Sequence, residues 1–264
     1  MSVQSPFADL DGPVALVTGG AGGIGTALCR MLAARGYRVV VADLDLTAAR
    51  SVADAIDGSA VAVDVGDWEA NRAMVDHALR RYGRLDLVAL NAAVNSGQRG
   101  SQPLDPRRYL ATNRVNVDGV VFGIDAVTGA LADRGGAIVV TASLAALAPE
   151  VSNAVYALGK AAVVGYVRAI ATHLSARGIT INAVCPAFVD TSMLSVKTRA
   201  VLTEQGFPLL SAGEVAAAAL ALADSGGTGE AWAMVAGRPP VRYDFPPVPT
   251  TLHADGRAAT LSLG

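Results

Sequence analysis

Short apolar runs alternate along the chain with longer segments that mix apolar and polar residues. Six short runs rich in β-branched residues have the length of strands: Val14–Thr18, Arg38–Ala42, Ala60–Val63, Leu85–Leu90, Ala137–Thr141 and Thr180–Val184. Strands that are apolar throughout are typical of a parallel sheet covered on both faces. The pattern predicts an α/β fold, a doubly wound parallel sheet with helices on both faces.

The longer segments carry apolar residues at helical spacing. We expect helices at Ile24–Arg35, Leu46–Ile56, Asp67–Tyr82, Pro106–Leu131, Asn153–Ala176 and Ala212–Ala223. The following segment, Thr228–Val235, predicts a seventh strand. Five prolines between Pro239 and Pro249 predict no regular element there, because proline fixes φ and lacks an N–H donor. We expect one domain over residues 1–264, with a core at about 13–237 and a proline-rich tail at 238–264.

Composition narrows the class of protein. A chain of 264 residues with 52% hydrophobic content suits one domain with a large core. The net charge is −2 and basic residues are scattered, which argues against binding to nucleic acid or to an anionic membrane. We expect a cytoplasmic protein, since the amino end lacks a leader pattern and no apolar run approaches the roughly 20 residues of a span. Cys29, Cys185 and three dispersed histidines predict no disulfide framework and no metal site, and both thiols should be buried.

A glycine-rich segment joins the first strand to the first helix. Residues 18–25 read Thr-Gly-Gly-Ala-Gly-Gly-Ile-Gly, a loop in which backbone N–H groups can approach a pyrophosphate. The next strand ends at Asp43, where a carboxylate can bind ribose hydroxyls and would repel a 2′-phosphate. Because Gly22 also takes the place of a basic residue, NAD is favoured over NADP. Asp43 could instead cap the next helix, but Asp45 is better placed to do so.

Tyr156 and Lys160 lie one helical turn apart on one face of a predicted helix. A phenol with a pKa near 10 can exchange protons near neutrality only if its phenolate is stabilised, and a neighbouring ammonium can do this. Ser143 follows a predicted strand, and the ends of such strands are where open α/β sheets bind ligands. A solvated tyrosine–lysine pair remains an alternative at this point.

The motifs between about Pro13 and Val235, and their order along the chain, resemble those of the classical short-chain dehydrogenase/reductase family. The resemblance implies a Rossmann-type fold with about seven strands and a catalytic tetrad of Asn116, Ser143, Tyr156 and Lys160. The cofactor-binding residues that it implies are Thr18, Gly19, Gly23, Ile24, Gly25, Asp43, Asp64, Val65, Asn91, Ala92, Ala93, Tyr156, Lys160, Pro186, Val189 and Thr191.

The resemblance also implies a mechanism. Hydride would pass between a carbinol carbon and the nicotinamide while Tyr156 acts as general base or acid. Ser143 would hold the substrate oxygen, Lys160 would bind ribose and lower the pKa of Tyr156, and Asn116 would link Lys160 to solvent through a water. Without the resemblance, Ser143 could merely cap the following segment and Asn116 could satisfy backbone groups in its helix.

Two positions depart from the family pattern. Val94 and Ala187 stand where the family usually has glycine. Alanine disfavours positive φ, so the backbone after Pro186 must adopt another conformation or accept strain of about 1 kcal/mol. The polar loop Val94–Pro106, which contains Gln98 and Arg99, either lines the entrance or is solvated, and we expect it to be solvated.

The substrate depends on the segments Leu144–Ser152 and Ser192–Gly213, which should form the pocket walls. Their few charges favour an apolar secondary alcohol or ketone over a phosphorylated sugar or thioester. The expected substrate contacts are Ser143, Leu144, Val151, Tyr156, Phe188 and Met193.

The partners that we expect are this small molecule and a second copy of the chain. The resemblance implies a homotetramer or homodimer formed through the helices around Asn116 and Tyr156, with the alanine-rich face of Ala161–Ala171 in the contact. The alternatives are an NADPH-dependent ketoreductase, an isomerase or dehydratase, and a non-catalytic nucleotide sensor on the same fold.

Overall fold

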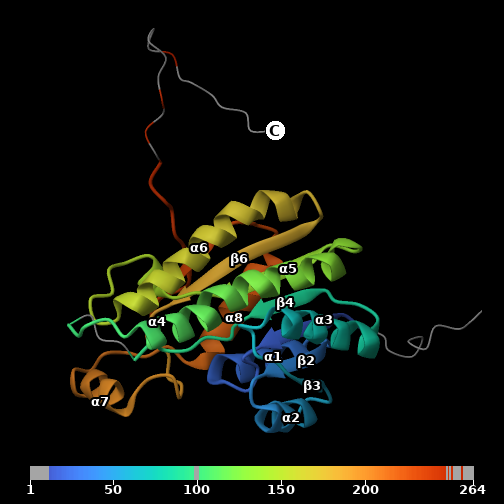
Figure 1. Ribbon diagram of the computed structural model, residues 1–264, viewed down its shortest axis with the longest axis horizontal. Helices are drawn as coiled ribbons and strands as arrows, with labels where there is room; N and C mark the ends of the chain where they lie inside the picture. The colour runs from blue at the N-terminus through green and yellow to red at the C-terminus, as the bar shows by residue number, and fades with distance from the viewer. Residues whose placement is uncertain (1–11, 98–100, 248, 250, 252–256, 258–264) are drawn as a thin grey trace, which may run out of the picture.

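The computed structural model describes residues 12–97 and 101–247, together with residues 249, 251 and 257. Their strands form one sheet in the order β3-β2-β1-β4-β5-β6-β7-β8 (Figure 1). The strands β1 to β7 pair in parallel, and β8 pairs antiparallel with β7. Their bounds are β1 Val14–Thr18, β2 Arg38–Asp43, β3 Ser59–Ala62, β4 Leu87–Leu90, β5 Gly136–Thr141, β6 Ile179–Pro186, β7 Ala231–Met234 and β8 Val241–Arg242.

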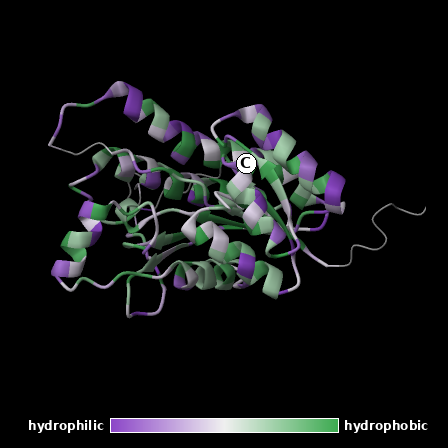
Figure 2. Ribbon diagram, turned by 90° about the horizontal axis from the view of Figure 1, so that it is seen from below, coloured by the Kyte–Doolittle hydropathy of each residue, from purple (hydrophilic) through white to green (hydrophobic). Residues whose placement is uncertain are grey.

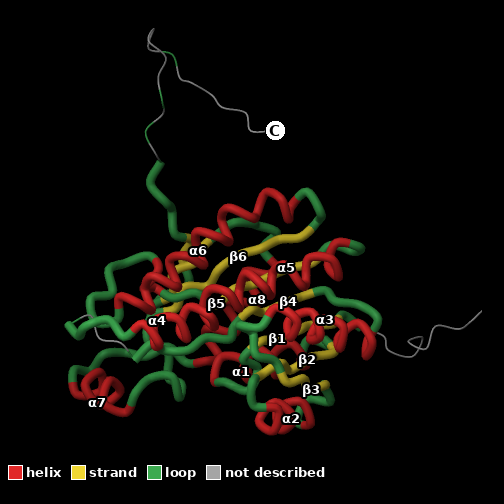
Figure 3. The backbone as a smooth tube through the Cα atoms, in the orientation of Figure 1, coloured by secondary structure: helices red, strands yellow, loops and turns green. Residues whose placement is uncertain are grey.

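Helices cover both faces of the sheet, as Figure 3 shows, which confirms the predicted doubly wound architecture. Residues of α3, α5 and α6 pack into one buried cluster, and residues of α1, α2 and α8 pack into another on the opposite face. Apolar residues accordingly concentrate along the strands and the inner sides of the helices (Figure 2). The helices are α1 Gly23–Ala34, α2 Leu46–Asp54, α3 Trp68–Tyr82, α4 Pro106–Asn113, α5 Gly119–Ala132, α6 Ala154–Ser175, α7 Val196–Glu204 and α8 Ala212–Asp224.

The strand order reverses between β1 and β4, and this is where an open α/β sheet forms a ligand crevice. Thr18, at the end of β1, joins the two strands. Its hydroxyl accepts hydrogen bonds from the N–H groups of Asn91 (3.0 Å) and Ala92 (3.1 Å), which follow β4. Thr18 itself is 2% exposed, so its side chain joins the two strand ends and does not face a ligand.

The predicted helix Pro106–Leu131 is divided by a π-helical turn at Arg114–Asp118. The apolar pattern runs on without interruption through this turn, so periodicity alone could not reveal it. The turn contains Asn116, which is fully buried, and π turns occur often at functional sites.

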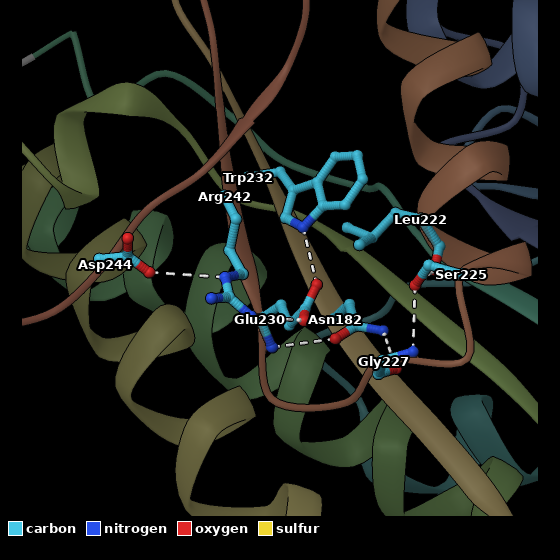
Figure 4. Close-up of polar contacts among 8 residues, drawn as sticks. All are labelled: Asn182, Leu222, Ser225, Gly227, Glu230, Trp232, Arg242 and Asp244. Atoms are coloured by element: carbon cyan, nitrogen blue, oxygen red, sulfur yellow. Dashed lines mark hydrogen bonds and ion pairs between the residues drawn. The ribbon is translucent and has the colours of Figure 1, made fainter.

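The tail contains a strand where the prolines predicted none. Val241 and Arg242 pair with Ala233 and Trp232 of β7. A polar network surrounds this pairing in Figure 4: Trp232 donates to Glu230 (2.8 Å), and the Arg242 guanidinium lies 3.4 Å from the same carboxylate. The prediction was wrong because the prolines flank these two residues, and an edge strand needs hydrogen bonds on one side only.

Two segments, Pro106–Ala132 and Ala154–Ser175, have the length and hydropathy of a membrane span, although the sequence analysis expected none. Both pack one face into the buried cluster that contains α3, and core helices of soluble proteins pass the same criterion. Within the described residues, no group of three or more histidine, cysteine or acidic side chains is placed to hold a metal ion. Cys29 and Cys185 are buried thiols, as predicted.

Candidate active site

A pocket of about 890 Å³ opens at the carboxyl ends of the central strands. It extends from the glycine-rich loop after β1 to the segments after β5 and β6. Of the residues predicted from the sequence, its wall contains Gly19, Gly23, Ile24, Asp43, Asp64, Val65, Asn91, Ala92, Ala93, Ser143, Leu144, Tyr156, Lys160, Pro186, Phe188, Val189, Thr191 and Met193. The fold therefore brings together the glycine loop, most of the tetrad and most of the predicted substrate contacts.

The glycine-rich loop has no room for a side chain at Gly19 or Gly25. Gly19 has a φ of +61°, and a Cβ there would lie 2.9 Å from the Cα of Ala92. A Cβ on Gly25 would lie 2.0 Å from the carbonyl oxygen of Gly19, so Gly25 shapes the loop from inside and does not line the pocket. The cap of α1 is Gly22, which offers no side-chain bond. The first N–H groups of α1 are thus available to a pyrophosphate, and the loop fits a dinucleotide.

Asp43 lies at the pocket wall beside this loop. Its carboxylate accepts hydrogen bonds from the N–H groups of Ala21 (3.0 Å) and Asp45 (3.1 Å). Asp45 caps α2 through the N–H groups of Thr47 and Ala48, as the sequence predicted. Asp43 is therefore free of a capping role and presents a negative charge to the pocket.

Lys160 and Tyr156 project from α6 towards the end of β5. Lys160 is 1% exposed, and its Nζ donates to the carbonyl oxygen of Thr141 (2.7 Å). The same Nζ lies 5.8 Å from the centre of the Tyr156 ring. Burial lowers the pKa of Lys160 to about 8.

The pKa of Tyr156 differs from the sequence expectation. Burial raises it, and a hydrogen bond from Ser143 partly opposes that rise. Lys160 was expected to lower this pKa, but its ammonium is directed to Thr141 instead of the phenol oxygen. In this arrangement, the phenol is therefore a proton donor near neutral pH.

Ser143 forms the capping bond that the structural alternative anticipated, whereas Asn116 bonds the loop after β4 and not backbone groups of its own helix. Ser143 Oγ accepts from the N–H of Ala145 (3.2 Å) and so caps a short 3₁₀ turn, while its hydroxyl donates to the carbonyl oxygen of Pro186 (3.5 Å). Asn116 does not line the pocket. Its amide pairs with both backbone groups of Val94, at 2.8 Å and 2.9 Å, so its side chain is committed to that loop rather than to Lys160.

The departures from the family pattern cause no backbone strain. Among the described residues, Asp57 is the non-glycine residue with positive φ, so Ala187 adopts another conformation. Its N–H donates to the carbonyl oxygen of Met234 (2.9 Å). Val94 lines the pocket.

The structure does not place Val151, a predicted substrate contact, in the pocket wall. Val151 is 87% exposed, whereas the preceding Glu150 is part of that wall. This turn precedes α6 and has neither helical nor strand periodicity, so sequence spacing could not show which side chain faces inwards. A cap pattern before α6 could have indicated Asn153, whose side chain accepts from the N–H of Tyr156 (3.3 Å) and lines the pocket.

The loop after Val94 is partly structural rather than solvated. Ser96 is 6% exposed and donates to Asn153, and the Asn153 amide donates to Asn95 (2.9 Å). Asn95 also lines the pocket. Gln98 and Arg99 lie outside the described residues.

The wall after β6 includes a helix that the sequence analysis missed. This helix, α7, is set apart from the sheet (Figure 1) and is joined to the pocket by Arg199, which pairs with Asp190 and donates to the carbonyl oxygen of Thr191 (3.0 Å). Phe188 and Phe207 meet edge to face, with centroids 5.7 Å apart, and form an apolar wall.

Replacing Lys160 by methionine should change how stability depends on pH. Burial lowers the pKa of Lys160 from 10.5 to about 8, so between these values the unfolded chain binds a proton that the folded chain does not. Stability therefore rises with pH in this window, and the wild-type chain should gain about 2 kcal/mol over Lys160→Met between pH 8 and pH 10. Urea unfolding of both proteins measures the difference, and parallel pH curves would contradict the burial of a titrating ammonium.

The family model described as short chain dehydrogenase matches residues 13–201. The chain is 40% identical over 193 residues to sex determination protein tasselseed-2 of Zea mays, which covers 70% of this chain and 57% of that protein. It is 33% identical over 195 residues to the NAD(+) 15-hydroxyprostaglandin dehydrogenase of Homo sapiens, and the match covers 70% of this chain and 71% of that protein.

A solved structure has the same fold. The 3-ketoacyl-(acyl-carrier-protein) reductase of Brucella melitensis, crystallised with NADH, matches with a TM-score of 0.81 at 28% identity over 87% of this chain and 99% of that one. The crevice at the strand reversal, the glycine loop and the Ser143–Tyr156–Lys160 cluster agree with these matches. The chain belongs to the short-chain dehydrogenase/reductase family, NAD(P)-dependent oxidoreductases that act on alcohols and ketones.

Proposed function

We propose that this protein oxidises an apolar secondary alcohol to a ketone with NAD as the hydride acceptor. The observation that supports the proposal most strongly is a single pocket that joins the glycine loop, a buried proton-exchanging cluster and a wall of apolar side chains. The wall around the cluster includes Leu144, Phe188, Met193, Leu194 and Phe207. Such a wall suits an apolar substrate that is oriented by a few polar groups.

Each polar group of the cluster has a role in this proposal. The hydroxyl groups of Ser143 and Tyr156 would hold the substrate oxygen, and the phenol oxygen of Tyr156 would exchange its proton. Lys160, whose Nζ donates to Thr141, would contact ribose. Thr18 would hold the two strand ends in register, while Asn116 would fix the loop after β4 by pairing with Val94. When bound, the nicotinamide supplies the carbon that accepts or releases hydride.

Ketone reduction is the second candidate, because burial raises the pKa of Tyr156. A phenol that stays protonated near neutral pH is ready to donate its proton to a carbonyl oxygen. The same site would therefore serve reduction near neutrality, and the oxidation rate should rise with pH as the phenolate becomes populated.

The preference for NAD is supported by the carboxylate of Asp43 at the pocket wall. Asp43→Asn keeps the shape of the side chain and removes its charge, so the ratio of NADPH affinity to NADH affinity should rise about tenfold or more. Asp45→Asn makes the same change two residues away, keeps the helix cap and should leave the ratio within about threefold. Fluorescence titration with both nucleotides measures the ratio. An unchanged ratio in Asp43→Asn would remove the basis for the NAD assignment.

Absorbance of reduced nicotinamide tests the reaction itself. The purified chain would be incubated with NAD and a panel of apolar secondary alcohols, and with NADH and the corresponding ketones. Turnover of at least one pair is expected, with NAD used faster than NADP. Tight NADH binding without turnover of any pair would favour the nucleotide-sensing alternative.

We also propose a homo-oligomer formed through α6 and the neighbouring helices. The exposed positions Ala161, Ala162, Gly165 and Ala169 give α6 a surface of small side chains that allows close helix packing. Light scattering of the purified chain measures its mass. A monomer at micromolar concentration would contradict the proposal.

A further inference from the structure

The charged side chains of the pocket wall are distributed unevenly. Among the described wall residues, the acidic ones are Asp43, Asp64 and Glu150, and the basic one is Lys160. Asp43 ends β2 and Asp64 follows β3, so both lie on the far side of β1 from the catalytic cluster. Glu150 lies between β5 and α6, on the substrate side, where it is the one charged wall residue besides the buried Lys160.

The carboxylate of Glu150 is fixed at the wall. One of its oxygens, Oε1, accepts from the N–H of Ser152 (2.8 Å) and from the hydroxyl of the same residue. Ser152 is itself part of the wall. The other oxygen, Oε2, receives no hydrogen bond from the described residues. An acceptor with unused capacity therefore lies beside an apolar surface that includes Leu144, Ala148 and Pro149.

Among the residues that the structure describes, no basic side chain pairs with the Glu150 carboxylate. Lys160 is buried, and its Nζ donates to Thr141 instead of an acidic side chain. Arg199, on α7, pairs with Asp190. An anionic group that entered the substrate side would therefore approach a negative charge that no described basic partner offsets, and Coulomb repulsion would oppose its binding.

We infer that Glu150 selects substrates by their charge. The pocket accepts neutral or cationic apolar alcohols and rejects alcohols that carry a carboxylate or phosphate. Glu150 Oε2 is available to a hydroxyl or ammonium group of the substrate that is distant from the carbinol. The inference rests on the proposed oxidation of a secondary alcohol. It goes further by naming the class of substrate and the residue that selects it. Specificity of this kind arises from repulsion of the wrong ligand as much as from attraction of the right one.

Three probes of one carbon skeleton test the inference. They are medium-chain secondary alcohols that end in a methyl group, a carboxylate or an ammonium group. For the wild-type chain, kcat/KM for the carboxylate probe should be at least tenfold below that for the neutral probe, and the ammonium probe should equal or exceed the neutral one. Glu150→Gln retains an acceptor for Ser152, so it should fold normally, and it should raise the carboxylate-to-neutral ratio about fivefold to tenfold.

Glu69→Gln is the matched control, because it removes the same charge from an exposed position in the first turn of α3. It should leave the ratio unchanged, which separates a local effect from one of net charge. If Glu150 serves only the local turn with Ser152, Glu150→Gln will also leave the ratio unchanged. That result would overturn the inference while the proposed oxidation stands.

A binding measurement separates the inference from the proposed reaction. Calorimetry with the methyl ketones of the same three probes, in the presence of NADH, reports affinity without requiring turnover. If the carboxylate ketone binds more weakly than the neutral ketone, and Glu150→Gln removes this difference, the inference is supported even if no probe is oxidised. A failure to oxidise any probe would refute the proposed oxidation alone. Equal affinities for the three ketones, or no binding of any, would overturn the inference.

Discussion

Tyr156→Phe should lower kcat for alcohol oxidation by roughly a hundredfold to ten-thousandfold and leave NADH affinity nearly unchanged. The substitution removes one oxygen atom, and that atom is the proposed proton-exchanging group of the cluster. The ring of Tyr156 remains, so its packing against the pocket wall and its distance from Lys160 are retained. A separate loss of nucleotide binding is not expected, because in the proposed function the glycine loop and Asp43 would hold the other end of the nucleotide.

The control for this variant is Tyr166→Phe, which removes a phenol oxygen from the same helix. Tyr166 lies outside the wall of the large pocket and faces a separate cavity between α5 and α6. This variant should retain wild-type turnover. Rates for the alcohol and the ketone, measured alongside NADH titration, distinguish the outcomes. Wild-type turnover by Tyr156→Phe would exclude the assigned proton transfer.

Gly25→Ala should remove nucleotide binding and cost more stability than any other alanine substitution in the glycine loop. The new Cβ would lie 2.0 Å from the carbonyl oxygen of Gly19 and 2.8 Å from the Cα of Gly20. Both are backbone atoms, so no flexible side chain can move away, and the loop must open. Overpacking of this kind costs about 1–3 kcal/mol or more.

Two further glycine variants allow the effect of Gly25→Ala on stability and NADH binding to be compared with milder substitutions. At Gly23 a Cβ would meet the methyl group of Thr191 at 2.6 Å, and a side chain can shift, so Gly23→Ala should fold and bind NADH more weakly. At Gly129, in α5, a Cβ meets nothing within 4 Å. Gly129→Ala should raise stability by about 0.5–1 kcal/mol because alanine favours a helix. Urea unfolding and NADH titration should rank the three variants in this order, and a stable Gly25→Ala that binds NADH would show the loop to be arranged differently.

The strands and their order along the chain could be predicted because buried parallel strands leave an unambiguous apolar pattern. The runs at Val14–Thr18 and Ala137–Thr141 were recognised to within one residue of β1 and β5. Tyr156 and Lys160 could be placed together because the helical period puts residues four apart on one face. Ser143 could be assigned to the same site because the ends of neighbouring parallel strands meet at one edge of a sheet.

The remaining features depend on local geometry that produces no periodic pattern in the sequence. The π turn at Asn116 and the inward direction of Glu150 rather than Val151 arise from local backbone conformation. The short strand β8 escaped prediction because its flanking prolines dominate the composition of that segment. The raised pKa of Tyr156 reflects burial and the direction of the Lys160 ammonium, neither of which the sequence spacing contains. Prediction was thus good for repeated patterns and poor for single side chains in turns.

Following one hydride tests the proposed oxidation most directly. The purified chain would be given NAD and an apolar secondary alcohol that carries deuterium at its carbinol carbon, and the reduced nucleotide would be examined by mass spectrometry. We expect reduced nicotinamide that carries one deuterium, formed at a rate that falls at least a hundredfold in Tyr156→Phe. Binding of NADH without formation of any labelled nucleotide from any alcohol of the panel would contradict the proposed oxidation.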